Sequence, residues 1–362
     1  MRFPEFSGEW EKHTIGELCE EFKSGKNIKA ENIQAGGVYP VFGGNGLRGY
    51  ADRYNHEGDY VLIGRQGALC GNVRFVTGKT YITEHAIAAK ATNNNYTHFL
   101  EYLFVRLNLG QFSDQSAQPG LAVNKLLKIE TFAPSKEEQY KIASLLKFLD
   151  ERIATQNKVI EDLKKLKSAI AERVYNCRTY QLYRIGDVIE QVSKRNTRMS
   201  IDKVLSVSNK LGFINQSEQF EDRIVASEDT SNYKIVYKDD FAYNPARINV
   251  GSIARLKHFN KGIVSPMYIC FRVKQGIVLD YLEYFFTTNY FFYEMQKRLE
   301  GSVRQCLSFE GLCNIPIYIP NLDEQQKMGR KVSVIMEKID NENRYLDSLK
   351  MQKQYLLRQM FI

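Results

Sequence analysis

Three short motifs in the sequence have residue types that could bind a phosphate or a methyl donor. Gly78-Lys79-Thr80 ends like a phosphate-binding loop, but the glycine that such a loop needs five positions earlier is Val73. The glycines of residues 42–46 match a loop that binds S-adenosylmethionine, yet residues 47–50 do not open a helix. Residues 244–247 (Asn-Pro-Ala-Arg) are close to an adenine-methylating loop but lack the aromatic ring that would stack on a flipped base. Since no motif is complete, we predict that the chain has no catalytic activity by itself.

The histidines and cysteines do not have the spacing of a metal site. The six cysteines are scattered and include no Cys-x-x-Cys, which is typical of buried or idle thiols in a reducing cytoplasm. No apolar run is long enough to cross a bilayer, and the first residues do not resemble a signal peptide. The sequence therefore predicts a cytoplasmic protein without a metal site.

The remaining polar chemistry is suited to reading DNA. Arg pairs bidentately with guanine, Asn and Gln pair with adenine, and Lys and further Arg hold phosphates. Residues of these types cluster on expected loops in the first half of the chain: Asn45, Arg48, Arg53, Arg65, Gln66, Asn72 and Arg74. A second cluster follows in the second half: Lys194, Arg195, Asn196, Arg198, Asn244, Arg247, Asn249 and Arg255. Any one of them is most simply a solvated surface residue, so only the clusters indicate DNA binding.

A repeat in the sequence would position these clusters. Residues 134–139 (Pro-Ser-Lys-Glu-Glu-Gln) recur as residues 320–325 (Pro-Asn-Leu-Asp-Glu-Gln), an offset of 186 positions that continues without a gap. Each copy has a capping residue, Ser135 or Asn321, three positions before a Glu that can reach back to the cap N–H. The pattern predicts one long helix in each copy.

The apolar residues of both helices follow a 4-3 spacing that predicts a narrow coiled-coil seam. The predicted seam residues are Ile142, Leu146, Leu149, Ile153, Ile160, Leu163, Met328, Val332, Ile335, Ile339, Leu346 and Leu349. Polar residues interrupt both stripes at matching positions: Gln156 with Glu342, and Lys167 with Lys353. We expect these polar residues to fix the register of two facing helices, although two separate helices, each buried in its own domain, would also fit. The ends of a compact domain lie close together, so the two helices should run antiparallel.

The repeat divides the chain into two similar halves. The first half has a domain at 1–133 and a helix at 134–178, and the second half has a domain at 179–319 and a helix at 320–362. We therefore predict an α+β fold in which two similar α/β domains are joined by two long antiparallel coiled-coil helices with pseudo-twofold symmetry. Within the domains, residues 39–50 should form a glycine-rich loop and residues 282–295 a single helix.

The net charge of +8 is compatible with an anionic partner but does not identify one. Residues 1–133 contain equal numbers of basic and acidic side chains, so the first domain is neutral. A DNA-binding face must therefore come from the local arrangement of charges.

Over nearly the whole chain the sequence resembles the specificity subunit of type I restriction-modification enzymes. The features that carry the resemblance are the two Pro-x(3)-Glu-Gln helix starts, the Ile-Gly-(Glu/Asp) openings at 15–17 and 185–187, and residues 39–46 (Tyr-Pro-Val-Phe-Gly-Gly-Asn-Gly). The resemblance implies two target-recognition domains, each reading half of a bipartite site in double-stranded DNA, with the helix pair setting the spacer. It also implies two modification subunits that bind S-adenosylmethionine, and restriction subunits that use ATP and Mg²⁺.

Two other functions remain open at this point. A self-contained methyltransferase or nuclease is disfavoured by the incomplete motifs. A coiled-coil adaptor would instead use the two domains to dock proteins, and salt-dependent binding of duplex DNA would separate it from a DNA-reading subunit.

Overall fold

The computed structural model describes residues 2–113, 120–175, 177–209, 211–216, 229–302 and 304–361. The chain forms two compact units, which are described separately. Unit 1 consists of Met1–Asn157 with Arg344–Ile362, and unit 2 consists of Lys158–Asn343. Each unit therefore contains a domain, part of the first long helix and part of the second. The two cuts fall at Asn157 and Asn343, which are equivalent positions of the 186-residue repeat.

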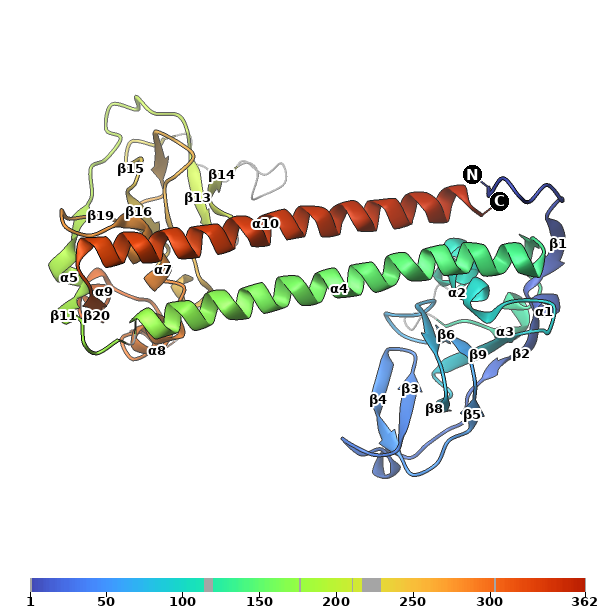
Figure 1. Ribbon diagram of the computed structural model, residues 1–362. Helices are drawn as coiled ribbons and strands as arrows, with labels where there is room; N and C mark the ends of the chain where they lie inside the picture. Colours follow the sequence, from blue (N-terminus) through green and yellow to red (C-terminus); the bar gives the residue numbers. More distant parts are fainter. Residues whose placement is uncertain are drawn as a thin grey trace. The chain divides into compact units, whose positions relative to one another are not determined.

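The two long helices are α4 (Lys136–Tyr175) and α10 (Leu322–Gln359), as the repeat predicts (Figure 1). Their N-terminal caps are confirmed, because the backbone N–H groups of Glu138 and Glu324 donate to the side chains of Ser135 and Asn321 at 3.4 Å and 2.9 Å. The expected reach of the first glutamate back to its cap is not found. The Glu138 carboxylate, which is 1% exposed, instead accepts two hydrogen bonds from the Arg2 guanidinium at 2.7 Å and 2.8 Å.

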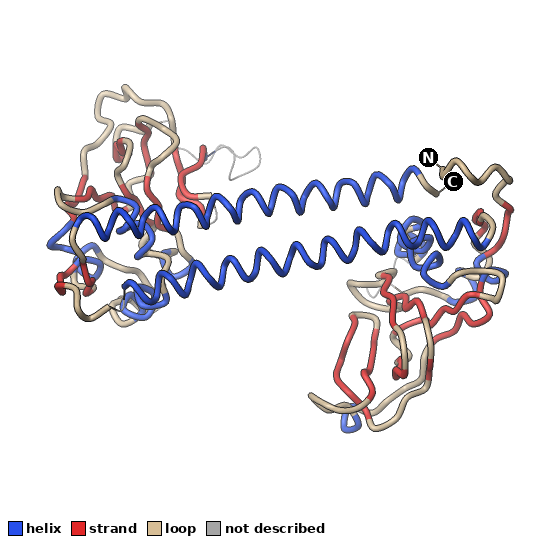
Figure 2. Tube along the Cα trace, viewed as in Figure 1, coloured by secondary structure: helices blue, strands red, loops and turns tan. Residues whose placement is uncertain are grey.

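Unit 1 contains three sheets and several short helices (Figure 2). Its central antiparallel sheet has the order β2-β9-β6-β7, a mixed sheet has the order β4-β3-β8-β5, and β1 pairs with β10. The strands are β1 (Glu11–Thr14), β2 (Cys19–Ser24), β3 (Tyr39–Gly43), β4 (Gly46–Ala51), β5 (His56–Glu57), β6 (Tyr60–Gly64), β7 (Val73–Val76), β8 (Lys79–Ile82), β9 (Ala86–Ala91) and β10 (Glu130–Ala133). The helices are α1 (Ile15–Leu18), α2 (Thr97–Leu107), α3 (Val123–Leu126) and the 3-10 turns η1 (Ala30–Asn32) and η2 (Leu109–Phe112).

Unit 2 repeats the central sheet strand for strand, with the order β12-β19-β16-β17. Outside that sheet β11 pairs with β20, β13 with β14, and β15 with β18. The strands are β11 (Gln181–Arg184), β12 (Ile189–Val192), β13 (Leu205–Ser208), β14 (Gly212–Asn215), β15 (Lys234–Tyr237), β16 (Phe241–Tyr243), β17 (Ile253–Arg255), β18 (Lys261–Val264), β19 (Ile269–Val273) and β20 (Pro316–Ile319). The helices are α5 (Ile185–Val188), α7 (Leu279–Phe285), α8 (Asn289–Gln296), α9 (Phe309–Cys313) and the turn η3 (Ile248–Val250).

Two local predictions are wrong. Residues 39–50 form the hairpin of β3 and β4 rather than a loop, and the register shifts between Val41 and Phe42. Glycines are needed there because the hairpin packs closely: a Cβ at Gly49 would lie 2.5 Å from the Gln34 carbonyl oxygen. The expected single helix at 282–295 is divided into α7 and α8, because the Thr288 side chain accepts from the Phe291 N–H and starts a new helix.

The predicted seam is buried or half-buried at all twelve positions. In unit 1, Ile142, Leu146 and Leu149 share one core with Leu349 of α10, and Phe99 and other residues of α2 belong to the same core. In unit 2, Met328 and Val332 share a core with the end of α4 and with α7. The apolar stripe therefore packs against the partner helix and the domain together, which combines the two alternatives that the sequence left open.

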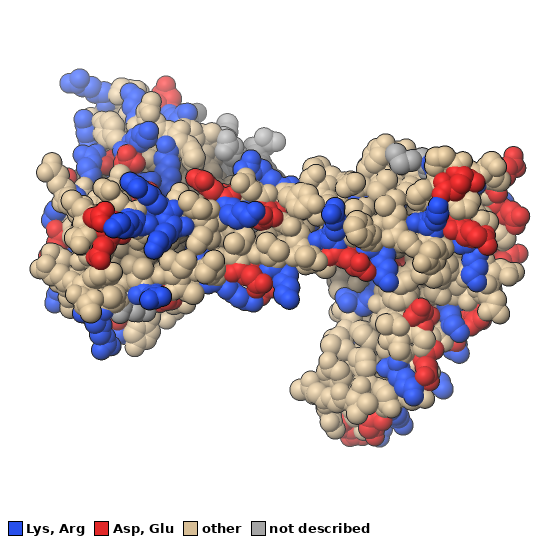
Figure 3. Space-filling model, viewed as in Figure 1, with Lys and Arg blue, Asp and Glu red and all other residues tan. Residues whose placement is uncertain are grey.

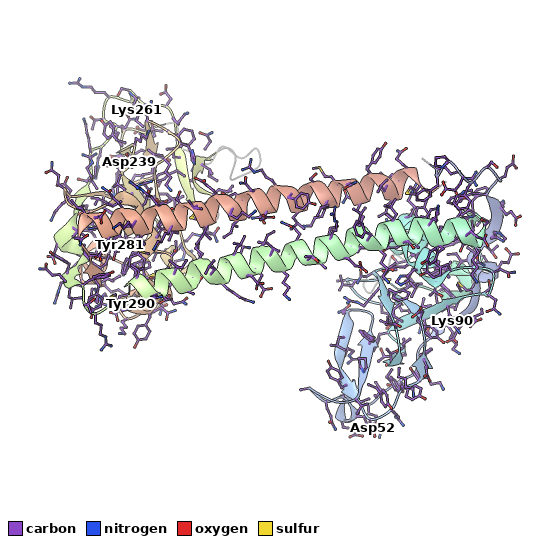
Figure 4. The ribbon with its side chains drawn as sticks, in the orientation of Figure 1. Asp52, Lys90, Asp239, Lys261, Tyr281 and Tyr290 are labelled. Carbon is purple, nitrogen blue, oxygen red and sulfur yellow. The ribbon has the colours of Figure 1, made fainter. Side chains whose placement is uncertain are left out.

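Within each unit the two helix segments are antiparallel. In unit 1, Phe361 after the end of α10 stacks on Phe99 of α2, with ring centroids 5.3 Å apart, and the start of α2 is bonded to the start of α4. In unit 2, Tyr175 at the end of α4 packs on Tyr281 of α7, with ring centroids 4.8 Å apart, and the start of α7 is bonded to the start of α10 (Tyr281 is labelled in Figure 4).

A buried glutamine makes these bonds in both units. The amide of Gln139 accepts from the Tyr96 N–H at 3.0 Å and donates to the Pro134 carbonyl at 3.0 Å. The amide of Gln325 accepts from the Val278 N–H at 2.8 Å and donates to the Pro320 carbonyl at 2.9 Å. Both side chains are 1% exposed, so each glutamine satisfies buried backbone groups that water cannot reach.

Replacing Gln325 by Ala should lower the free energy of unfolding by about 2–4 kcal/mol, because buried N–H and C=O groups lose their partners. Urea denaturation would measure the change. Gln326→Ala is the matched control, since the neighbouring Gln326 is exposed and its loss should change stability by less than about 0.5 kcal/mol. Equal stability of the two variants would contradict the assigned role.

Candidate nucleic-acid interface

In unit 1, three segments meet at one end of the central sheet. The segment between β6 and β7 begins with Arg65, whose N–H donates to the His85 carbonyl just before β9, at 2.9 Å. The Arg65 carbonyl accepts from the Leu121 N–H at 2.9 Å, so residues 120–121 join the same end. Backbone hydrogen bonds therefore hold these segments together whatever their side chains are.

Unit 2 repeats this junction with different residues. The segment between β16 and β17 contains Pro245, whose carbonyl accepts from the Leu307 N–H at 3.1 Å. This hydrogen bond corresponds to that between Arg65 and Leu121. The segment before β19 joins the junction through the Asn244 amide, which lies 3.8 Å from the Met267 sulfur.

A glycine ends the sharp turn in each of two equivalent segments, the one between β6 and β7 in unit 1 and the one between β16 and β17 in unit 2. Gly71 and Gly251 have positive φ angles of 85° and 87°, and they occupy equivalent positions before β7 and β17. An L-residue is strained at such angles, so the sharp turn needs glycine. The side chains of the two segments are therefore presented on closed, defined turns.

A hairpin also reaches the junction in unit 1. A Cβ added at Gly44, between β3 and β4, would lie 2.7 Å from the His85 carbonyl oxygen, and one at Gly46 would lie 3.2 Å from the Arg74 guanidinium. The hairpin that was expected to be a loop thus brings its own side chains to the same end of the sheet.

The junction gathers six of the seven residues predicted in unit 1. They are Asn45, Arg48, Arg65, Gln66, Asn72 and Arg74, of which Arg65 is half-buried and the others are exposed. The Gln66 amide oxygen lies 3.2 Å from the His85 ring nitrogen Nδ1. Arg53 is separate, because it follows the far end of β4 and its guanidinium lies 5.9 Å from the centroid of the Tyr81 ring.

In unit 2 the junction gathers Asn244, Arg247 and Asn249 from the predicted set. Arg247 and Asn249 are exposed, whereas the Asn244 side chain also accepts from the Ala246 N–H at 3.1 Å. A second predicted group lies in the segment between β12 and β13, beside β15: Lys194, Arg195 and Arg198. All three are exposed, and Figure 3 shows Lys and Arg gathered over the part of unit 2 that carries β13, β15 and β16.

Two predicted residues have structural roles, and we remove them from the DNA-reading set. Asn196 is 1% exposed, and its amide donates to the Ile201 carbonyl at 2.9 Å. The Arg255 side chain is 11% exposed and lies among three carboxylates, those of Asp239, Asp280 and Glu283, at 3.7 Å, 2.7 Å and 3.4 Å (Asp239 is labelled in Figure 4). The sequence does not reveal such burial, because Asn and Arg occur both on surfaces and in paired interior positions.

The structure adds three residues that the sequence reasoning missed. His85, Met267 and Arg304 lie on the segments that build the two junctions, and Met267 and Arg304 are exposed. A signal for the Arg304 segment was present in the repeat, because the 186-residue offset places Leu307 opposite Leu121, and both leucines donate to the equivalent junction bonds.

Titratable groups outside the junctions have shifted pKa values for structural reasons. Burial lowers the pKa of His56, although Glu21 at 3.0 Å opposes the shift. Burial also raises the pKa of Cys19 and of Cys270 to about 12. Among the described residues there is no group of three or more His, Cys, Asp or Glu side chains that could hold a metal ion. No helix in the described part of the chain is both long and apolar enough to cross a membrane.

Comparison with known proteins identifies the architecture. The family model of the type I restriction modification DNA specificity domain matches residues 7–165 and 178–351. The type I restriction enzyme EcoprrI specificity subunit of Escherichia coli is 38% identical over 180 residues, which are 49% of this chain and 44% of that protein. The chain thus spans less than half of that relative in the match. A putative type I specificity subunit of Mycoplasma genitalium is 24% identical over 384 residues. This match covers 97% of the present chain and 94% of that protein.

Solved structures show the same fold. The crystal structure of a type I restriction-modification system S subunit from M. genitalium superimposes with a TM-score of 0.69 and 18% identity, over 98% of this chain and 96% of that one. A second match is a chain from a structure that describes the complex assembly and conformational transition of the type I R-M system. It superimposes with a TM-score of 0.57 and 13% identity, over 98% of both chains.

Replacing Arg255 by Ala should lower the free energy of unfolding by about 1–2 kcal/mol, because the partly exposed carboxylates of Asp280 and Glu283 would lose the counter-charge of a guanidinium that is itself only 11% exposed. Arg247→Ala is the control in the same unit, since Arg247 is exposed and has no side-chain partner among the hydrogen bonds and ion pairs of the described residues. Chemical denaturation of both variants tests the assignment. A destabilised Arg247 variant beside an unchanged Arg255 variant would reverse the two roles.

Proposed function

The chain belongs to the type I restriction-modification DNA specificity family, and we propose that it is the DNA-recognition subunit of such a system. Each unit reads one half of a bipartite site in double-stranded DNA. The subunit is not an enzyme by itself, and methylation and cleavage belong to its partners.

The observation that carries this proposal is the junction that both units build from different side chains. The backbone bonds of Arg65 with Leu121 and of Pro245 with Leu307 are equivalent, whereas the exposed residues around them differ. One frame with two sets of side chains is what two readers of different half-sites require. Sequence-specific contacts need Arg, Asn and Gln at defined places, and these are the residue types found there.

The contact between Gln66 and His85 supports a reading role in unit 1. The Gln66 amide lies 3.2 Å from the Nδ1 atom of His85, and the Glu84 carboxylate lies 3.3 Å from the Nε2 atom of the same ring, so the imidazole is contacted on both sides and holds the exposed Gln66 amide in place. An amide with a fixed orientation can distinguish a base that accepts from one that donates. The neighbouring Arg65 and Arg74 supply donors for guanine or for phosphate.

The partners follow from the family rather than from this chain. We propose that two modification subunits bind S-adenosylmethionine and methylate adenine, and that restriction subunits use ATP and Mg²⁺ to translocate and cut DNA. The chain itself holds none of these cofactors in this proposal, and the assembly acts in the cytoplasm. The helix pair formed by α4 and α10 docks the modification subunits.

Single substitutions should change one half of the recognised sequence. Arg65→Ala should relax discrimination at one position of one half-site, and Arg247→Ala at one position of the other, each at a cost of about 1–3 kcal/mol if the guanidinium reads guanine. The measurement is the set of methylated adenines produced by the complete modification complex with each variant.

The control for these variants is Lys12→Ala, because Lys12 is exposed on β1, away from the junction, and pairs with Glu130 at 2.7 Å. This variant should methylate the original sequence. A loss of binding that is equal for all DNA sequences would identify Arg65 or Arg247 as a phosphate contact. A single variant that changes both half-sites would contradict the proposal that each unit reads one half-site by itself.

We further propose that α4 and α10 set the length of the spacer between the half-sites. Helices of 40 and 38 residues are each about 60 Å long, and DNA advances about 34 Å per turn. Duplicating one heptad in both helices, at 153–159 and 339–345, keeps the apolar stripe continuous and adds about 10 Å.

The lengthened subunit should recognise the same half-sites with a spacer that is longer by up to about three base pairs, or fewer if the DNA bends. Insertion into one helix alone should abolish activity, because the two stripes would lose their register. The methylated sequence made by the lengthened subunit with its partners is the readout. Activity on an unchanged spacer would show that the helices do not set the distance.

A further inference from the structure

Unit 2 exposes three large aliphatic side chains on the segments around its junction. Leu211 lies in the turn between β13 and β14 and is 72% exposed, Val250 lies between β16 and β17 and is 52% exposed, and Met267 lies before β19 and is 60% exposed. Single exposed apolar residues are common on protein surfaces. Here three different segments each contribute one at the same end of the unit, which calls for a specific explanation.

Packing brings the three segments together. A Cβ at Gly251 would lie 3.8 Å from the Cβ of Asn209, and one at Gly212 would lie 3.6 Å from the Cβ of Ala254, so the β13–β14 turn borders the segment that carries Val250. The Asn244 amide lies 3.8 Å from the Met267 sulfur and connects the third segment to the second. We call Leu211, Val250 and Met267 the apolar triplet.

Hydrogen-bonded turns hold each member of the triplet. The Leu211 N–H donates to the Ser208 hydroxyl at 3.4 Å, and the Val250 N–H donates to the Arg247 carbonyl at 3.2 Å. Met267 lies inside a turn closed by the Tyr268 N–H and the Ser265 carbonyl at 3.0 Å. Because Val250 and Met267 lie in turns closed by backbone hydrogen bonds, ordering these two residues on binding costs little conformational entropy.

The charges around the triplet favour an anionic partner. Residues 208–212, 244–252 and 265–268 contain no Asp or Glu, and Arg247 in the second of these segments is exposed. Arg304 is exposed on the segment that the Leu307 N–H connects to Pro245. A protein-docking patch of this size would need an apolar partner surface, whereas the polar and basic rim here matches nucleic acid. On the major-groove edge of DNA the apolar group is the 5-methyl of thymine.

We propose that the apolar triplet recognises thymine in the half-site of unit 2 through its 5-methyl group. This inference rests on the proposed function, and it adds a kind of base contact that Arg, Asn and Gln cannot make. The methyl group leaves water and packs against Leu211, Val250 or Met267, while the amide and guanidinium groups nearby make the polar contacts. Cytosine at the same position lacks the methyl group and is discriminated against.

Replacing thymine by uracil removes that methyl group and leaves the base pairing unchanged. The test uses the complete complex of this chain with its modification subunits and duplexes in which each thymine of the two half-sites is replaced in turn by deoxyuridine. Binding should weaken about fourfold at one or more positions of the half-site read by unit 2, the factor that corresponds to about 0.8 kcal/mol for one buried methyl group.

Variants identify the residue responsible. In Leu211→Ser, Val250→Ser or Met267→Ser, the effect of deoxyuridine should disappear at the position that the missing side chain contacts. Leu182→Ser is the matched control, because Leu182 is 56% exposed on β11, the strand that pairs with β20 away from the junction. This control should keep the full response to deoxyuridine.

The outcomes separate this inference from the function on which it rests. Sequence-specific binding that is indifferent to deoxyuridine throughout that half-site would overturn the thymine contact and leave the recognition function intact. A response that survives in all three serine variants would also overturn it. Loss of DNA bending in those variants without a response to deoxyuridine would identify the triplet as a wedge between base steps instead. Absence of sequence-specific binding in the assembled complex would contradict the proposed function itself.

Discussion

The structure of each unit depends on one buried glutamine at the start of a long helix. Gln139 and Gln325 bond the carbonyl of the proline that precedes the helix and the N–H that starts a domain helix. A single side chain thereby connects the start of the long helix to the start of a domain helix, beside the apolar core that the two share. An apolar residue could fill the same space, but it would leave the backbone groups of Tyr96 or Val278 without partners in a dry site. The repeated Glu-Gln therefore marks the joint at which each domain is attached.

The polar interruptions of the two stripes are not equivalent. In unit 1 the Lys353 ammonium bonds Asp150, which also accepts from the Tyr102 hydroxyl at 2.9 Å. In unit 2 the position equivalent to Asp150 is Met336, and burial lowers the pKa of the half-buried Lys167. The repeat keeps the lysine but only one unit keeps its acid. A charged contact therefore adds to the apolar packing of the two helices in unit 1, whereas in unit 2 the described contacts of Met328 and Val332 are apolar.

The sequence predicts the two long helices and the order of the domains well, because helix periodicity and an internal repeat can be recognised without tertiary contacts. The 4-3 spacing gives α4 and α10, and the repeat gives two domains of similar order. The sequence does not predict features that depend on tertiary contacts. The glycines of residues 39–50 belong to a close-packed hairpin rather than a loop. Arg255 forms ion pairs with three carboxylates from other segments of unit 2. At the junctions, residue type alone identified Arg65 and Arg247 but not Met267. An apolar residue in a polar segment is identified as part of an interface only when its exposure is known.

Backbone bonding at the junctions explains how one fold can serve two different readers. The bond of Leu121 to Arg65 and that of Leu307 to Pro245 use only main-chain atoms, so they survive any exchange of side chains except one that needs a different φ. The positive φ angles of the two equivalent turns, at residues 71 and 251, are adopted by glycine, which takes them without strain. Side chains between these fixed points contribute little to stability, because most of them are exposed. Substitutions there can change which bases are contacted while the cores around Phe99 and Tyr281 stay intact, and this separation of stability from recognition allows the two units to diverge within one chain.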